Sequence, residues 1–300
     1  MGRIADALKK AEAERQRLRA AAGGGGVSLL DAPEALAPQP VEAPEEQRES
    51  VVVPRAPIEA DDGIHESVHP FYDRSSLISE QYRSLRTRLL TQNPQGDHRV
   101  LAITSAIPRE GKSVTTANLG IIMAEIRHFK IVVVDADFRR GRLGRLLDAK
   151  PGPGFADLLK GDARYEDIVQ PSPIPNLFVV SAGETSGRSA AELLSSQRAS
   201  AVVRRLQSDF HYTLIDTPPA TTVTDVGVIG QMCNGVIMIV RLNCTPEPLA
   251  RRAIRLLRVN KVPIMGCLLI GKSDRGVSYG YSYGYYYKYY AKDGPDDQRR

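Results

Sequence analysis

The chain has 300 residues, of which 42% are hydrophobic and 25% are charged, and its formal net charge is +5. A charge this small for the length gives no electrostatic reason to expect nucleic-acid binding. No apolar run approaches the roughly 18 residues that span a bilayer, and the N-terminus lacks the apolar stretch of a secretory signal, so we expect a soluble chain.

The cysteines and histidines predict neither disulfides nor a structural metal site. Cys233, Cys244 and Cys267 are odd in number and lie in apolar segments, which is typical of buried hydrophobic residues in a reduced cytosol. The five histidines show no metal-ligand spacing.

The N-terminal quarter of the chain differs in composition from the rest. Residues 1–22 are expected to form a basic amphipathic helix with a narrow apolar stripe that includes Ile4 and Leu8. This helix is either solvated or docks on a partner helix or an anionic membrane. Residues 23–75 are rich in proline, alanine and glutamate, and they cannot bury enough apolar area to offset their ordering entropy. We expect a disordered tether there.

Residues 76–272 carry the pattern of one α/β domain, which begins with a helix from Ser76 to Leu90. Near-continuous apolar strands then alternate with helices, which predicts a three-layer α/β fold, a mainly parallel sheet with helices on both faces. Such sheets bind ligands at the carboxyl ends of their strands. The predicted strands are 100–104, 131–134, 177–180, 213–215, 235–240 and 263–269, and the predicted helices are 113–127, 155–159, 190–206 and 246–258.

The first strand runs into a candidate phosphate-binding loop, Ser105 to Ser113, and a helix follows. In such a loop, backbone N–H groups and the helix N-terminus hold phosphate oxygens. Lys112 would reach the β- and γ-phosphates, and Ser113 would hold a magnesium ion. Because Ala106 replaces the first glycine of the strict pattern, the loop by itself could also be a chance turn.

Two further strands deliver acidic residues at their ends. Asp135 and Asp137 follow one strand, and Asp216 follows another and precedes two prolines. Carboxylates at these positions can bind magnesium directly or through water, or accept the proton of an attacking hydroxyl. Each segment alone could be a strand that ends in a charged turn, but all three strand ends would converge on one magnesium nucleotide. Together they predict a P-loop NTPase-type three-layer fold.

A tyrosine cluster occupies the expected flexible tail, residues 273–300. Eight of the twelve tyrosines of the chain lie in twelve consecutive residues. The cluster is either a low-complexity tail that self-associates by stacking or a phosphoryl acceptor. Its members are Tyr279, Tyr281, Tyr283, Tyr285, Tyr286, Tyr287, Tyr289 and Tyr290.

Taken together, these motifs resemble the bacterial tyrosine autokinases, the BY-kinases of capsule and exopolysaccharide export, over residues 76–290. The resemblance implies an ATP- and Mg²⁺-dependent protein-tyrosine kinase that phosphorylates its own tyrosine cluster and regulates polysaccharide synthesis and export. The segments that carry the resemblance are Pro108 with Gly111-Lys112-Ser113, Asp135 with Asp137 and Arg139, Asp216-Thr217-Pro218-Pro219, and the tyrosine cluster.

The resemblance also implies a role for each site residue. Lys112, Asp135 and Asp137 are the catalytic candidates, and either aspartate could accept the tyrosine proton, with Asp135 slightly preferred. The magnesium candidates are Ser113, Asp135 and Asp216. The nucleotide-binding candidates are Ser105, Pro108, Arg109, Glu110, Gly111, Lys112, Ser113, Val114 and Arg139.

The helix from Ser76 contains Glu80, Arg83 and Arg86, which look like the family's Glu-x-x-Arg-x-x-Arg motif. That motif joins subunits into a ring by meeting the neighbour's nucleotide site, so phosphorylation in trans is expected. From the residues alone, a solvated helix face with an internal ion pair would be the preferred interpretation of these three residues. Repulsion between phosphorylated tails is expected to disassemble the ring.

The absence of a predicted membrane span makes the chain similar to the stand-alone type of the family. That type implies a cytoplasmic protein, recruited peripherally to the inner face of the membrane by a separate activator or polysaccharide co-polymerase. Further partners implied by the family are a tyrosine phosphatase and, as substrates, sugar-metabolism enzymes. We expect no nucleic-acid partner.

Two other functions are compatible with the fold. A positioning ATPase of the MinD/ParA kind would carry a lysine five residues before Lys112, where this chain has Ile107, and would have no use for the tyrosines. A non-catalytic nucleotide-binding regulator would not need the complete set of lysine, serine and aspartates. Base recognition is the least defined part, because Gly271 and Lys272 stand where related folds often place an adenine-reading asparagine.

Overall fold

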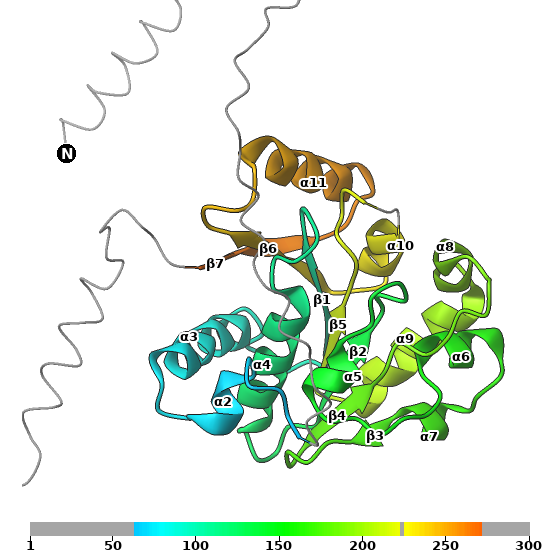
Figure 1. The fold of residues 1–300 in the computed structure, drawn as a ribbon, viewed down its shortest axis with the longest axis horizontal. Coiled ribbons are helices and arrows are strands. Elements are labelled where there is room, and N and C mark those ends of the chain that lie inside the picture. The colour runs from blue at the N-terminus through cyan, green and yellow to red at the C-terminus, as the bar shows by residue number, and fades with distance from the viewer. Residues whose placement is uncertain (1–62, 223–224, 272–300) are drawn as a thin grey trace, which may run out of the picture. The chain divides into compact units, whose positions relative to one another are not determined.

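The computed structural model describes residues 63–222 and 225–271. A single seven-stranded sheet forms its centre, with the strand order β3-β4-β2-β5-β1-β6-β7 (Figure 1). All neighbouring strands are parallel except the short β3, which pairs antiparallel with β4. The predicted fold class is confirmed. The strands are β1 (Arg99–Ser105), β2 (Ile131–Asp135), β3 (Gln170–Pro171), β4 (Leu177–Val180), β5 (Tyr212–Asp216), β6 (Gly235–Arg241) and β7 (Ile264–Ile270).

Helices cover both faces of the sheet because the side chains of its buried strands alternate between two apolar clusters. In β1, for example, Leu101 and Ile103 pack toward α2 to α5, whereas Val100 and Ala102 pack toward α6 to α11. The helices are α2 (His69–Tyr72), α3 (Leu77–Thr91), α4 (Lys112–Ala124), α5 (Leu143–Leu146), α6 (Phe155–Lys160), α7 (Tyr165–Ile168), α8 (Ala190–Leu194), α9 (Gln197–Asp209), α10 (Asp225–Gln231) and α11 (Glu247–Val259).

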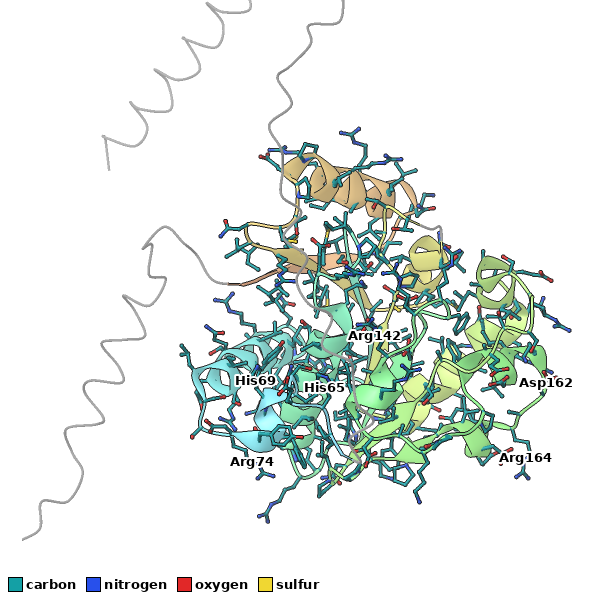
Figure 2. The ribbon with its side chains drawn as sticks, viewed as in Figure 1. His65, His69, Arg74, Arg142, Asp162 and Arg164 are labelled. Carbon is teal, nitrogen blue, oxygen red and sulfur yellow. The ribbon has the colours of Figure 1, made fainter. Side chains whose placement is uncertain are left out.

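The packed region begins earlier than expected. Within the expected tether, residues 63–75 are ordered against the domain: Ile64 and Val68 are buried, and the His65 N–H donates to the Leu146 carbonyl at 3.2 Å. Disorder was therefore the wrong expectation for this part, because two apolar side chains suffice to anchor it on α4 and α5. Figure 2 labels two residues of this segment, His65 and His69, the latter being the first residue of α2. The expectations for residues 1–62 and 272–300 concern residues outside the described ranges.

Two further details differ from the sequence-based expectations. The helix expected over residues 190–206 is two helices, because the Ser196 hydroxyl caps a new helix by accepting from the Ala199 N–H at 3.1 Å. Cys233 is buried, but Cys244 and Cys267 are exposed. Cys267 is exposed because β7 is the edge strand of the sheet. No helix among residues 63–222 and 225–271 has the length and apolar character needed to cross a membrane.

Candidate active site

Three adjacent strands, β2, β5 and β1, bring the predicted motifs to one edge of the sheet. Asp135 and Asp216 end β2 and β5, and they are direct register partners. Ser105 ends β1, on the other side of β5. The convergence expected from the sequence is therefore present, because parallel neighbouring strands deliver their carboxyl ends to the same edge.

The loop between β1 and α4 is folded by its own polar groups. The Ser105 hydroxyl donates to the Ile107 carbonyl at 2.7 Å, and the Ile107 N–H donates to Glu110 Oε2, also at 2.7 Å. Gly111 is the N-cap of α4 with φ of 80°, a left-handed conformation that favours glycine. The loop thus leads directly into a helix whose free N–H groups can face an anion.

The Glu110 side chain makes its hydrogen bonds to other groups of the protein. Its side chain is 0% exposed, and its second carboxylate oxygen, Oε1, accepts a hydrogen bond from the Thr245 hydroxyl. The Thr245 oxygen in turn accepts the Arg241 N–H at 2.8 Å. Both carboxylate oxygens of Glu110 are therefore occupied by protein groups, and the carboxylate ties the phosphate-binding loop to the segment after β6.

Lys112 is the first residue of α4 and is 7% exposed. Burial lowers the pKa of its ammonium group, and the carboxylates of Asp216 and Asp137 act in the opposite direction. The loop lysine is thus enclosed between acids at the sheet edge, where an anionic phosphate could replace solvent around it. Pro108 and Arg109 are exposed at the tip of the loop, and Val114 is half-buried in the first turn of α4.

Asp135 is held rigidly. Its Oδ1 accepts the Asp137 N–H at 3.1 Å, and its Oδ2 accepts the Leu143 N–H at 2.9 Å. Burial raises the pKa of Asp135 to about 6, although these backbone hydrogen bonds work against the rise. The chain can pass this closely because Gly141 has no Cβ: one would lie 3.3 Å from Asp135 Oδ2 and 2.6 Å from the Ala182 Cβ.

Asp216 is 1% exposed and accepts a hydrogen bond from the Ser113 hydroxyl, with 2.5 Å between the two oxygens. Its other oxygen, Oδ1, is buried and has no hydrogen-bond partner among the described residues. Burial, followed by repulsion from Asp135, raises the pKa of Asp216 well above its usual range. An unsatisfied carboxylate oxygen beside a second buried acid is costly, and a cation would relieve this cost.

These groups fit a hard divalent cation. Ser113, Asp135 and Asp216 offer only oxygen donors, which suit magnesium better than a soft transition metal. Residues 63–222 and 225–271 contain no group of three or more His, Cys, Asp or Glu residues that could hold a metal ion by themselves. Magnesium usually binds one or two carboxylates and completes its shell with water and phosphate oxygens.

The structure adds a buried acid that the sequence analysis missed. Asp225 is the first residue of α10 and is 2% exposed. Burial raises the pKa of Asp225, and the guanidinium of Arg139 opposes the rise. The charge of Asp137, which is half-buried, acts to raise the pKa of both Lys112 and Asp225. A lone aspartate after a proline pair carries no sequence signal, so only the fold reveals its proximity to Arg139.

Arg139 begins a basic segment at the mouth of the site. Its members Arg139, Arg140, Arg142 and Arg145 are all exposed. Figure 2 labels Arg142, which is the N-cap residue of α5. The segment follows Asp137 directly, so it places positive charge beside the acidic strand ends, where phosphate oxygens or an acidic partner would be attracted.

The motif on α3 makes ion pairs within its own chain. Arg83 contacts Glu80 at 2.5 Å and Glu125 at 2.6 Å, and Arg86 contacts the other oxygen of Glu125 at 2.8 Å. Arg86 also donates to the Ile122 carbonyl. Glu125 follows the last residue of α4, so this network joins α3 to the C-terminal end of the helix that begins at the phosphate-binding loop.

Comparison with known proteins connects this geometry to a family. A family model described as ParA, NUBPL iron-transfer P-loop NTPase, matches residues 97–269. The chain is 30% identical to the tyrosine-protein kinase YwqD of Bacillus subtilis (strain 168) over 207 residues, which are 69% of this chain and 86% of YwqD. It is 27% identical to the putative tyrosine-protein kinase CapB of Staphylococcus aureus over 207 residues, 69% of this chain and 90% of CapB.

Solved structures agree. The BceF tyrosine kinase domain matches with a TM-score of 0.62 and 31% identity, over 68% of this chain and 81% of that chain. MinD from Pyrococcus horikoshii OT3, complexed with Mg-ADP, matches in fold with a TM-score of 0.51 and 21% identity, over 59% of this chain and 72% of that chain. A P-loop NTPase fold generally binds a nucleotide together with a divalent metal. The chain therefore belongs to the bacterial tyrosine-protein kinases and is a protein-tyrosine kinase built on a ParA-type P-loop NTPase fold.

Proposed function

We propose that this kinase uses ATP and Mg²⁺ to phosphorylate its own tyrosine cluster, Tyr279 to Tyr290. The observation that carries the proposal is the convergence of Lys112, Ser113, Asp135 and Asp216, with the buried Asp216 Oδ1 lacking a partner among the described residues, in a chain that also carries eight clustered tyrosines.

The reaction is an in-line phosphoryl transfer. A bond forms between the tyrosine oxygen and the γ-phosphorus, the bond from that phosphorus to the β–γ bridging oxygen breaks, and ADP leaves. Ser113, Asp135 and Asp216 would hold Mg²⁺, which would supply positive charge to the phosphates of the nucleotide. Lys112 would neutralise the same phosphates from the helix N-terminus.

A tyrosine hydroxyl has a pKa of about 10, so a carboxylate must accept its proton at neutral pH. Asp135 and Asp137 were both candidates. Asp135 is buried with both oxygens accepting backbone N–H groups, whereas Asp137 is half-buried and nearer to solvent. We therefore move the proton-accepting role to Asp137 and keep Asp135 as the carboxylate on the metal side.

The acceptor tyrosine comes from a neighbouring subunit in this proposal. Glu80, Arg83 and Arg86 would contact that neighbour in a ring-like homo-oligomer, and the tail that follows β7 would reach across. The kinase would act in exopolysaccharide or capsule production, recruited from the cytoplasm to the inner face of the membrane by a separate activator. A tyrosine phosphatase would reset the tail, and sugar-metabolism enzymes would be further substrates.

The deciding experiment compares Lys112→Met with the unaltered chain and with Lys150→Met, which removes an exposed lysine outside the site. Each full-length protein is incubated with γ-labelled ATP and Mg²⁺ and then probed for phosphotyrosine. We expect labelling of the unaltered chain and of Lys150→Met, and none of Lys112→Met. Equal labelling of Lys112→Met would refute the assignment of the site.

The match to the ParA family model favours one alternative, a positioning ATPase. Such a protein would hydrolyse ATP without forming phosphotyrosine. Replacing all eight cluster tyrosines with phenylalanine separates the two functions: the label incorporated into protein disappears if the cluster is the acceptor, whereas ATP hydrolysis by a positioning ATPase continues unchanged.

A further inference from the structure

The outer side of α11 carries an unusual concentration of positive charge, which we call the arginine face: Arg251, Arg252, Arg255 and Arg258. All four side chains are exposed. Their spacing of one, three and three residues places them on one side of the helix. The opposite side holds the buried Ala253 and Leu257, so packing fixes which side of α11 faces solvent. Figure 1 shows α11 over the β6 and β7 end of the sheet.

The fold leaves most of this charge without a counter-charge. Arg251 pairs with Glu247 at 2.7 Å across one helical turn. The side chains of Arg252, Arg255 and Arg258 make no hydrogen bond or ion pair with any residue of the described ranges 63–222 and 225–271. Like charges one turn apart repel, so the folded domain gains nothing from them. A face of this kind fits an anionic partner, and arginine is well suited to bind phosphate with two parallel hydrogen bonds.

The tyrosine cluster begins within reach of this face. Helix α11 connects the parallel strands β6 and β7, so it runs antiparallel to them and starts at the same edge of the sheet where β7 ends. Tyr279 lies eight residues beyond Gly271, a distance that an extended chain can span at about 26–29 Å. The 13 residues of α11 measure about 20 Å, so the cluster can reach every arginine of the face.

Charge makes this contact conditional on phosphorylation. The side chains of residues 272–300 comprise six lysines and arginines and four aspartates, a net charge of +2 that the arginine face would not attract. Each phosphotyrosine adds about −1.5 to −2. Three phosphotyrosines change the net charge of the tail from +2 to about −3. Their phosphate oxygens also accept hydrogen bonds from the guanidinium groups of Arg252, Arg255 and Arg258, which have no acceptor among the described residues.

We propose that the arginine face of α11 binds the phosphorylated tyrosine cluster of this chain. The unmodified tail stays free to enter a nucleotide site. The phosphorylated tail leaves that site and docks on α11. This inference rests on the proposed function for the source of the phosphate, but the binding itself needs only a phosphorylated tail. Docking would favour the forward reaction, because it would remove the phosphotyrosines from the nucleotide site in which they form.

The test uses the full-length chain, treated with a tyrosine phosphatase and held without ATP. The probe is a fluorescent synthetic peptide of residues 277–292 phosphorylated at Tyr281, Tyr285 and Tyr289, with the unphosphorylated peptide as its counterpart. Anisotropy gives the dissociation constants for three proteins. They are the unaltered chain, an α11 variant (Arg252→Gln, Arg255→Gln, Arg258→Gln), and a charge-matched control that loses three exposed arginines elsewhere (Arg88→Gln, Arg188→Gln, Arg204→Gln).

We expect the phosphopeptide to bind the unaltered chain at least about tenfold more tightly than its counterpart, and the α11 variant to lose at least about tenfold while the control changes less than about threefold. Equal losses in the two variants, or no preference for phosphate, would overturn the proposal. So would vesicles with about 30% phosphatidylserine that bind through α11 while the phosphopeptide does not, which would assign the face to a lipid surface.

Because the peptide is synthetic, the outcome is independent of the kinase reaction. Absence of self-phosphorylation in the unaltered chain would refute the proposed function but leave phosphopeptide binding measurable. Conversely, an α11 face that ignores the phosphopeptide in a chain that labels its own tail would refute only the docking.

Discussion

At the scale of single residues, the site is built from groups that are costly to bury. Asp135 and Asp216 lie side by side in the low-dielectric edge of the sheet, and burial raises the pKa of each. Lys112 is buried close by, and burial lowers the pKa of its ammonium group. Shifts of pKa in opposite directions for neighbouring acids and a lysine are typical of functional sites, since ionisable groups are rarely buried in a core that serves only packing.

The pKa of about 6 for Asp135 predicts a pH dependence. As a metal-side carboxylate, Asp135 must be ionised, so kcat/KM for phosphorylation should fall at least about tenfold per pH unit below about pH 6. Initial rates measured from pH 5 to pH 8 at subsaturating ATP would show this. A rate that stays constant down to pH 5 would contradict an ionised Asp135 in the reaction.

Asp216→Asn should stabilise the protein without nucleotide while abolishing phosphorylation. Because the folded state raises the pKa of Asp216, it binds the proton more tightly than the unfolded chain does, and the free energy of unfolding falls as pH rises above 3.8 toward the folded pKa. Asparagine cannot ionise and still accepts from Ser113. We therefore expect a higher free energy of unfolding for Asp216→Asn at pH 8.

Urea unfolding of Asp216→Asn and the unaltered chain measures this gain, with the surface variant Glu192→Gln as the control. The difference between Asp216→Asn and the unaltered chain should be larger at pH 8 than at pH 5. A variant less stable than the unaltered chain at both pH values would show that the Asp216 charge supports the fold.

At the scale of elements, the ion pairs between α3 and α4 compete with the proposed subunit contact. Glu125 already holds both Arg83 and Arg86, which the ring proposal needs for a neighbour. These pairs are partly exposed, and such pairs contribute at most about 1 kcal/mol. A neighbouring subunit could therefore take over the guanidinium groups at little cost, which makes Glu125 an intramolecular competitor of assembly.

Glu125→Gln should strengthen self-association, because it frees Arg83 and Arg86 for the neighbour, whereas Arg83→Gln should weaken it. Light scattering over a concentration series gives the dissociation constant of each variant, and Glu192→Gln is the matched control that removes an exposed acid from α8. If Glu125→Gln assembles less well than the unaltered chain, the network supports the contact surface and does not compete with it.

At the scale of the whole molecule, the tail is both the proposed product and a regulator of assembly. Each phosphate adds about −1.5 to −2, so eight modified tyrosines would give every subunit a strongly anionic tail. We expect phosphorylation to dissociate the ring, by repulsion between tails and by their transfer to the arginine face. Light scattering before and after incubation with ATP would test this, with Lys112→Met as the control, and an unchanged assembly would contradict it.

The sequence by itself determined the fold class and most of the site. Short apolar runs such as Ile131–Val134, followed by turn residues, are typical of buried strands, and the loop around Lys112 is predictable as a phosphate-binding loop because its pattern is local in the sequence. The acids at the ends of neighbouring strands were also predictable, since parallel strands place their carboxyl ends together.

Only the tertiary structure decided which distant groups meet. Thr245 completes the loop through Glu110, Asp225 lies near Arg139, and Glu125 takes both arginines of α3. These partners are 39 to 135 positions apart where a direct hydrogen bond joins them. Strand order also decided that β7 is an exposed edge and that α11 presents an uncovered face. Periodicity reports which side of an element is buried, but pairings over such separations depend on how the whole sheet is assembled.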